Sequence, residues 1–226
     1  MSRFNKGGTL MRVTLLLSLL LLAAGACWAA PSLNGPTGVL NTPNAAVVPT
    51  GTYNAFLNFA KIGEADLTRY GINAGLGTAT PFEVGFTSFD VEDEDSHLVL
   101  NAKVVLPVQM KSPGALALGV FDLTDEEDAQ TPYLVYSREF TTGQGPQARP
   151  IYASIGFGSN DWDWILDGLF LSACMPVSDQ ALVMLEFDAE DFNAGARFQI
   201  AENFSADVGI VNDELAFGLA YYLVPK

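Results

Sequence analysis

The sequence predicts an all-β fold: a transmembrane, antiparallel, up-and-down β-barrel of about 12 strands that follows a cleaved signal peptide. Three observations predict it. The first 29 residues have the pattern of a secretory leader. After residue 50 the chain divides into short segments in which apolar residues alternate with small or polar ones. The net charge is −15, and most acidic residues fall in alternate connections between these segments.

Residues 1–29 form the predicted signal peptide. Three basic residues precede an apolar run over residues 13–24, and small residues follow it. Cleavage after Ala29 places Cys27 and Ala29 at the two positions of the cleavage site that favour small residues. The alternative is lipoprotein processing at Cys27, because three small residues precede that cysteine. We expect Sec export and the outer membrane of a diderm bacterium as the destination.

Residues 30–51 are rich in glycine and proline, which makes them unsuited to a central strand. We expect them to form a defined turn segment at the periplasmic mouth of the barrel or in its lumen. The residues that define this N-terminal box are Gly35, Pro36, Gly38, Asn41, Thr42 and Pro43.

Residues 52–226 form the predicted barrel. In residues 192–200 the even-numbered positions are apolar and the odd-numbered positions are Asn, Gly, Arg and Gln. A soluble β-sandwich or lipocalin-like cup also alternates, but its exposed face carries Lys, Glu and Thr rather than small residues, so we favour a wall that meets lipid. The predicted strands are 52–61, 67–77, 82–91, 97–106, 115–124, 131–139, 150–158, 165–175, 180–188, 192–200, 203–211 and 214–223.

With an even number of strands, the first and the last residue of the barrel lie on the same side of the membrane, which we take as periplasmic. The six connections on the opposite side are all acidic. We interpret this rim as a solvated face that keeps molecules from pairing through their strands; the alternative is a weak divalent-cation site that bridges to lipopolysaccharide. The acidic charge excludes nucleic acid as a partner. The residues of the alternative cation site are Glu92, Asp93, Glu94, Asp95, Asp125, Glu126, Glu127 and Asp128.

The same alternation directs charged residues into the lumen. Neighbouring strands are predicted to pair Glu83 with Lys103. They are also predicted to pair Arg69 with Asp90, and Arg197 with Asp207. We expect these pairs to brace the wall, because an unpaired buried charge is costly; the alternative is a ring that sets pore selectivity. The charges expected in the lumen are Arg69, Glu83, Lys103, Arg138, Glu186, Arg197 and Asp207.

The sequence shows no catalytic centre. His97 is the single histidine, and its neighbour Ser96 would point to the opposite face of a strand. We find no nucleophile elbow, metal-ligand spacing or phosphate-binding glycine loop, so we predict no catalytic residue, metal or cofactor. Cys174 lies in an apolar run, and we expect an inert thiol in the wall or facing lipid.

Two parts of the chain resemble a known family. Residues 32–45, with the sequence SLNGPTGVLNTPNA, resemble the start of the YjbH-like outer-membrane β-barrel proteins, which are associated with exopolysaccharide or capsule production. The stretches 185–198, 203–205 and 217–222 are similar to that family's closing hairpins. The chain is shorter than the large family members. Its last residues are Leu-Val-Pro-Lys rather than the terminal aromatic residue typical of barrel-assembly signals, a role that we expect Tyr222 or Tyr221 to take. The resemblance implies a short single-barrel member, with a non-enzymatic role in polysaccharide secretion or surface assembly.

We therefore expect an outer-membrane barrel that acts in export or assembly of an extracellular polysaccharide. Its expected partners are membrane lipid, lipopolysaccharide, the barrel-assembly machinery and a polysaccharide or its secretion proteins. The alternative is a small passive, porin-like channel for ions or solutes. A lipid-modifying enzyme is a third alternative, which replacement of His97 would test.

Overall fold

A computed structural model describes residues 29–62, 65–91, 96–108, 113–125, 130–143, 148–160 and 166–225. Residues 1–28 of the predicted signal peptide lie outside these ranges. Within the described ranges, no helix has the length and apolar character needed to cross a membrane.

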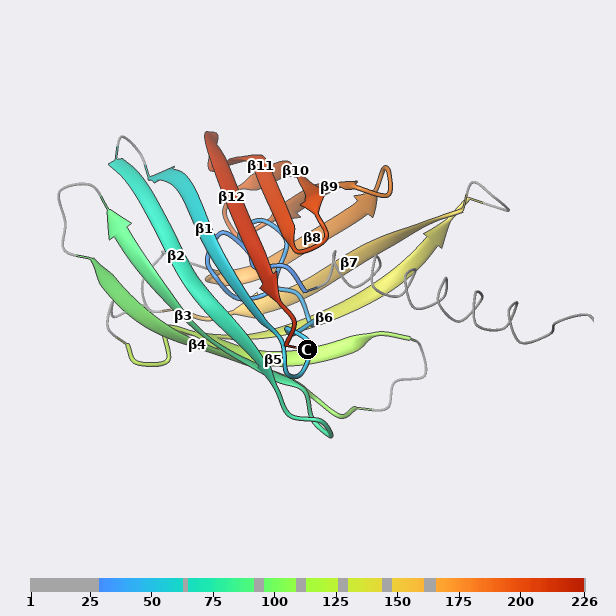
Figure 1. The fold of residues 1–226 in the computed structure, drawn as a ribbon, viewed down its shortest axis with the longest axis horizontal. Coiled ribbons are helices and arrows are strands. Elements are labelled where there is room, and N and C mark those ends of the chain that lie inside the picture. The colour runs from blue at the N-terminus through green and yellow to red at the C-terminus, as the bar shows by residue number, and fades with distance from the viewer. Residues whose placement is uncertain are drawn as a thin grey trace, which may run out of the picture.

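Twelve antiparallel strands close into one barrel (Figure 1). Each pairs with its neighbours in sequence, and the first pairs with the last, with Tyr53 opposite Leu223. The structure confirms the predicted fold class and strand number, and the predicted strand ends are off by a few residues at most. The strands are β1 (Tyr53–Ile62), β2 (Ala65–Leu76), β3 (Phe82–Val91), β4 (His97–Val105), β5 (Ala115–Phe121), β6 (Thr131–Thr142), β7 (Arg149–Gly158), β8 (Gly168–Pro176), β9 (Ala181–Phe187), β10 (Phe192–Ala201), β11 (Phe204–Val211) and β12 (Glu214–Leu223).

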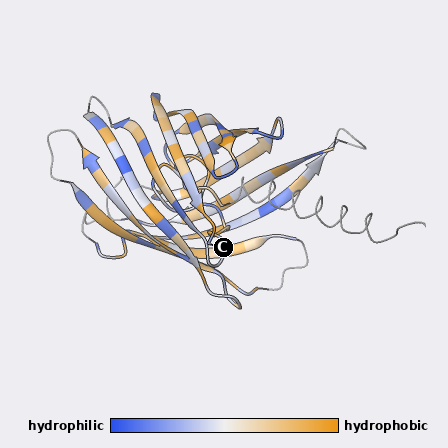
Figure 2. Ribbon diagram, viewed as in Figure 1, coloured by the Kyte–Doolittle hydropathy of each residue, from blue (hydrophilic) through white to orange (hydrophobic). Residues whose placement is uncertain are grey.

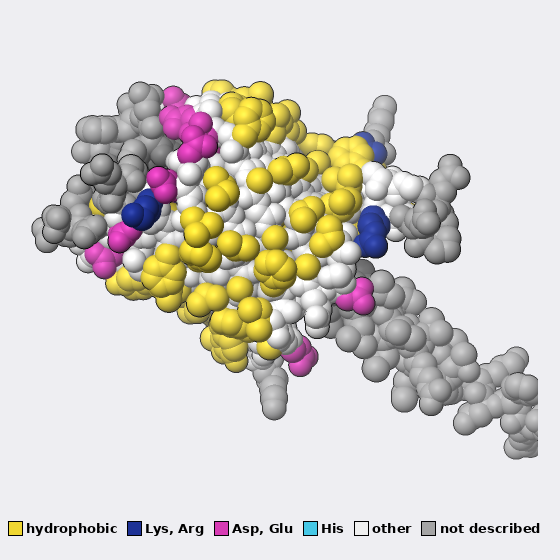
Figure 3. Space-filling model, turned by 90° about the horizontal axis from the view of Figure 1, so that it is seen from above, with side chains coloured by type: hydrophobic (Ala, Val, Ile, Leu, Met, Phe, Trp, Pro, Cys, Tyr) yellow, Lys and Arg dark blue, Asp and Glu magenta, His cyan; other side chains and the backbone are white. Residues whose placement is uncertain are grey.

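Successive side chains point to opposite faces of the wall, as they must in a β-strand. In β10, for example, Phe192 is 86% exposed and Asn193 is 2% exposed. Apolar and polar residues accordingly mix along every strand (Figure 2), and apolar side chains cover much of the outer surface (Figure 3). Large apolar side chains on this outer belt include Tyr70, Ile72, Phe86, Leu118, Leu134, Ile155, Leu185, Leu215, Phe217 and Tyr221.

The two ends of the barrel differ in charge. We call the end where β1 begins and β12 ends the terminal mouth, and the opposite end the acidic mouth. Acidic side chains gather at the acidic mouth, at the left of Figure 3. Those described there include Asp66, Asp90, Asp122, Asp125, Asp167, Asp188, Glu190, Asp191, Asp213 and Glu214.

The chain's own N-terminal part occupies the lumen. Residues 29–51, which we call the lumen segment, run inside the wall (Figure 1, blue). Two isolated backbone pairings, Pro31 with Thr37 and Gly38 with Pro43, fold the segment into compact loops. Its buried apolar side chains are Ala30, Leu33, Val39, Leu40, Ala45 and Val48.

Apolar side chains of the inner wall and of the lumen segment form two clusters inside the barrel. In the first, Phe89 and Phe121 pack edge to face, with ring centroids 5.6 Å apart. The alternation along the sequence predicts small or polar residues on the inner wall and does not predict these apolar cores. The first cluster contains Ala45, Leu67, Phe89, Val99, Ala117, Phe121, Tyr133, Val135, Leu166 and Phe170. The second contains Leu33, Val39, Leu40, Tyr152, Cys174, Leu182, Met184, Val211 and Ala216.

Candidate functional site: the lumen segment and its anchors

Glu186, on the inner face of β9, binds the lumen segment through many contacts. Its carboxylate accepts hydrogen bonds from the backbone N–H groups of Leu40 (3.1 Å), Asn41 (2.6 Å) and Thr42 (3.1 Å). The Thr42 hydroxyl donates to it at 2.8 Å. Consecutive backbone N–H groups directed at one anion form a recurrent anion-binding arrangement. One buried carboxylate therefore fixes this loop of the lumen segment to the wall.

Asn193 and Asp188 extend this anchor. The Asn193 side-chain amide, on β10, donates to Glu186 at 3.1 Å and to Asp188 at 2.7 Å. Asp188, just beyond the end of β9, also accepts a hydrogen bond from the Asn41 side chain at 3.0 Å. Glu186 and Asn41 are among the residues predicted from the sequence, whereas Asn193 is not, although it is a polar residue at an inward position of a strand.

Glu83 on β3 and Lys103 on β4 form a second anchor. They lie opposite each other in register, 3.8 Å apart and almost fully buried, as the predicted ion pair requires. Glu83 accepts hydrogen bonds from the backbone N–H groups of Thr37 and Val48, each at 2.9 Å, and from the Thr37 hydroxyl. Lys103 donates to the Thr37 carbonyl at 2.7 Å. Both members of the pair thus bind the lumen segment as well as each other.

Arg197 on β10 and Asp207 on β11 form the third anchor. The guanidinium donates two hydrogen bonds of 2.7 Å to the two Asp207 carboxylate oxygens, the bidentate geometry that favours arginine. The same guanidinium also donates to the carbonyls of Pro31 (3.1 Å) and Val39 (3.0 Å). Asp207 therefore orients the arginine that holds both ends of one loop.

Asparagine side chains of β1 and β2 bind the first turn of the lumen segment. Asn58 donates to the carbonyls of Ser32 (3.2 Å) and Leu33 (3.1 Å). Asn73 donates to the carbonyl of Gly35 at 2.7 Å. The alternation along the sequence predicts a small and polar inner face but no specific role for these asparagines.

Glycines of the inner wall make room for the segment. A Cβ atom at Gly75 would lie 2.1 Å from the Val48 carbonyl oxygen. The Leu40 side chain rests against two neighbouring glycines, 3.0 Å from the position of a Cβ at Gly195 and 3.3 Å from that at Gly209. The glycines at these three positions are therefore explained by close approach of the lumen segment.

The predicted pair of Arg69 with Asp90 is wrong. Arg69 faces the lumen, but its partner in register is Phe89, and its guanidinium carbon lies 5.3 Å from the centre of that ring. Asp90 is the next residue on β3, so it points to the outer face, where it is exposed. Arg69 instead contacts the lumen segment through the Leu33 carbonyl, at 3.5 Å.

The prediction that Arg138 faces the lumen is also wrong. Tyr133, Val135 and Ser137 are the buried, inward residues of β6, so Arg138 belongs to the outward set. Its guanidinium carbon lies 4.8 Å from the centre of the Phe140 ring. Both faces of this strand carry large apolar residues, and the phase of the alternation cannot be read from such a pattern.

The remaining candidate residues lie apart from the anchors. His97 begins β4 near the acidic mouth, and Cys174 faces the lumen in the cluster that contains Leu33 and Leu40. Among the described residues, no group of three or more Asp, Glu, His or Cys side chains could hold a metal ion. Residues 92–95 and 126–128 of the alternative cation site lie outside the described ranges.

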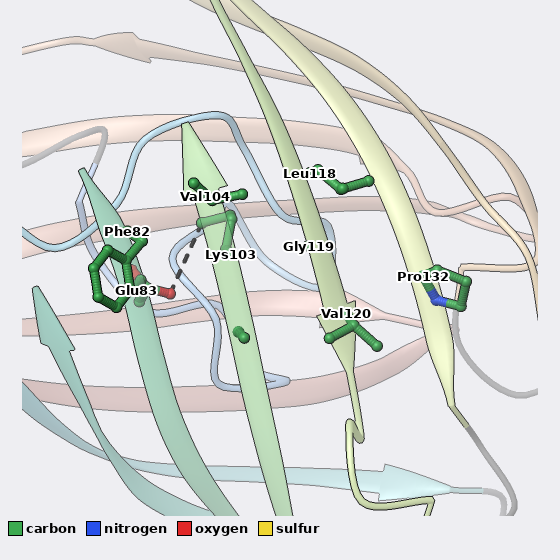
Figure 4. Close-up of a pocket in the computed structure, with 9 residues that line it drawn as sticks. Phe82, Glu83, Lys103, Val104, Leu118, Gly119, Val120 and Pro132 are labelled. Carbon is green, nitrogen blue, oxygen red and sulfur yellow. Dashed lines mark ion pairs between the residues drawn. The ribbon is translucent and has the colours of Figure 1, made fainter. Parts of the chain in front are cut away.

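An apolar hollow of about 360 Å³ opens on the wall formed by β3, β4, β5 and β6 (Figure 4). Its lining includes the outward side chains of Phe82, Val104 and Leu118. The Glu83–Lys103 pair, drawn with a dashed line in Figure 4, borders the same hollow. The polar groups of the pair are directed toward the lumen segment, as their hydrogen bonds show.

Removing the charge of Lys103 is expected to destabilise the folded barrel strongly. In Lys103→Met, Glu83 loses its counter-charge while it stays buried, and breaking such a pair costs about 3–5 kcal/mol. The loss is measured as a lower urea midpoint in detergent. The control is Lys61→Met, because the Lys61–Asp66 pair is exposed and exposed pairs contribute at most about 1 kcal/mol. Equal midpoints for the two variants would contradict this expectation.

No protein-family profile matches the chain, and no curated protein matches it. Among solved structures, the outer membrane protein Omp33 of Acinetobacter baumannii is similar with a TM-score of 0.48 and 8% identity, over 77% of this chain and 98% of that one. Two mutants of the Rh. blastica porin give TM-scores of 0.29 and 0.30 at 10% identity, each over 76% of this chain and 98% of the porin chain. Nothing about function follows from likenesses this low.

Proposed function

We propose that this protein is a non-enzymatic outer-membrane β-barrel of a diderm bacterium, and that it is a channel for small ions or solutes which the lumen segment closes. The closed sheet and its outer belt of exposed apolar side chains support the membrane location, because lipid would remove that belt from water. With the terminal mouth in the periplasm, the acidic mouth faces the cell exterior.

The observation that carries the channel function is the polarity of the wall behind the lumen segment. Asn58, Glu83, Lys103, Glu186 and Arg197 are all buried, and each binds the lumen segment. Departure of the segment would expose these groups to water, which satisfies them at little cost. The open lumen would then be lined by charges of both signs, which is a lining that ions tolerate.

Conductance tests this proposal. The mature protein and a variant lacking residues 31–49 are folded in detergent and placed in planar bilayers. We expect the intact protein to be closed for most of the time and the deletion variant to show steady conductance, because deletion removes the chain that occupies the lumen. A shift in gel mobility on heating checks that both barrels are folded. An absence of conductance in both folded proteins would identify a sealed scaffold and contradict the channel function.

The second candidate is the role in export or assembly of extracellular polysaccharide that the YjbH-like resemblance implies. One observation favours it. Residues 32–45, which carry the resemblance, include Thr37, Leu40, Asn41 and Thr42, and the backbone N–H groups of these four residues bind Glu83 and Glu186. Deleting the gene and quantifying surface polysaccharide tests this role. Unchanged polysaccharide in the deletion strain would contradict it and leave the channel proposal intact.

A further inference from the structure

We propose that Arg138 forms a binding site for the phosphate headgroup of a membrane lipid on the outer wall. The inference rests on the membrane location proposed above. Arg138 points outward from β6, where its partner in register is Ala153 of β7. The next outward residues on either side along β6 are Tyr136 and Phe140. A permanent charge therefore lies on an apolar part of the wall.

Among the described residues, no side chain or carbonyl accepts a hydrogen bond from the guanidinium of Arg138. It carries five N–H donors and does not lose its charge in proteins. Within the part of the chain that the structure describes, the Arg138 side chain makes no hydrogen bond or ion pair, and its Nε is buried without a partner. Its guanidinium carbon lies 4.8 Å from the centre of the Phe140 ring. Donors held in apolar surroundings are costly unless an acceptor binds them, so the site calls for an external anion.

The position of Arg138 along the wall suits a lipid headgroup. Strand β5 begins at Ala115, which pairs with Ser137, so Arg138 lies level with the end of β5 nearest the terminal mouth. Tyr136 leans over Gly114 at the same end, since a Cβ at Gly114 would lie 2.5 Å from the phenol oxygen. Phenol and guanidinium groups near strand ends are typical of the level at which lipid headgroups meet the protein.

A lipid phosphate fits this surface better than a free anion. The planar guanidinium can donate two parallel hydrogen bonds to phosphate oxygens. The exposed side chains of Leu134 and Ile155, which lie on the same outer face and nearer the membrane centre than Arg138, would be covered by the acyl chains of that lipid. Free phosphate would satisfy the charge but leave the apolar surface in water. With the terminal mouth in the periplasm, the lipid belongs to the inner leaflet.

The test compares lipid retention by variants of the mature protein. Folded protein in detergent is mixed with phosphatidylglycerol, or with diacylglycerol, which lacks phosphate, and bound lipid is counted by native mass spectrometry. We expect Arg138→Gln to bind phosphatidylglycerol about tenfold or more weakly, the usual effect of losing charged hydrogen bonds. The matched control is Arg149→Gln, because Arg149 already donates to the carbonyls of Pro176 and Val177, each at 3.3 Å. Diacylglycerol retention should be equal in all three proteins.

The outcomes separate this inference from the proposed function. Equal phosphatidylglycerol binding by Arg138→Gln and Arg149→Gln, with normal insertion of both into phosphatidylcholine vesicles, would overturn the headgroup site alone. Binding of inorganic phosphate that depends on Arg138 and matches the lipid in affinity would replace it with a free-anion site. Failure of the wild-type protein to insert into vesicles would overturn the membrane location and this site with it.

Discussion

Glu186→Ala is expected to release the lumen segment and to turn a closed barrel into a conducting one. The substitution leaves the backbone N–H groups of Leu40, Asn41 and Thr42 without their acceptor in the closed state. Hydrogen bonds to a charged group contribute about 1.5–3 kcal/mol each and do not add fully, so we expect a loss of about 4 kcal/mol. That loss raises the ratio of open to closed barrels by about a thousandfold.

Cys174 gives a direct measurement of this release. It is 5% exposed and packs in the cluster with Leu33 and Leu40 of the lumen segment. A membrane-impermeant maleimide should therefore label Cys174 much faster in Glu186→Ala than in the wild type, and channel openings should rise in parallel. The control is Glu202→Ala, which removes an exposed carboxylate outside the anchors. If folded Glu186→Ala and folded Glu202→Ala label at the same slow rate, Glu186 does not hold the segment.

Gly75→Val is expected to force the last residues of the lumen segment, next to β1, out of the barrel. The Cβ would lie 2.1 Å from the Val48 carbonyl oxygen and 2.3 Å from that of Pro49, and the nearest atoms all belong to the segment. Valine itself suits a β-strand, so the strain falls on the segment rather than on β2. Overpacking of this kind costs about 1–3 kcal/mol, and backbone atoms cannot move aside as a flexible side chain can.

Limited proteolysis reads out this displacement. We expect a protease added to the folded variant to cut within residues 31–50, which mass spectrometry of the shortened chain detects. The matched control is Ala74→Val, which places the same valine side chain on the outer face of the same strand. If the protease cuts the segment in Gly75→Val no faster than in Ala74→Val, the wall can move to accommodate the valine at this position.

The sequence predicted the features that follow from periodicity. Where one face is apolar and the other small or polar, as in β10, the alternation predicts strand, phase and lumen side together. The pairs Glu83–Lys103 and Arg197–Asp207 follow because their register is fixed by that phase. In β6, Leu134 and Tyr136 face outward while Tyr133 and Val135 face inward, so periodicity could not place Arg138.

The location of the lumen segment required the three-dimensional structure. Glycine and proline showed that residues 30–51 are not a central strand, but composition left open whether they lie at the mouth or in the lumen. The decision depends on contacts far apart in sequence, such as that between Asn41 and Glu186. The inward aromatic residues Phe89 and Phe121 were missed for a related reason, because an aromatic residue suits a lipid-facing wall and a packed core equally well.

The enclosed position of the lumen segment also constrains the order of folding. The segment directly precedes β1, and Asn58 of that strand binds it, so β1 carries it toward the seam with β12. That seam joins strands from the two ends of the barrel domain, and its loop-closure entropy makes it the slowest pairing, which we expect to form last. We expect the segment to have drawn together β3, β9 and β10 by then, through Glu83, Glu186 and Arg197. The hydrogen bonds that hold the segment in the lumen would thus also provide a template on which a long-range sheet can assemble.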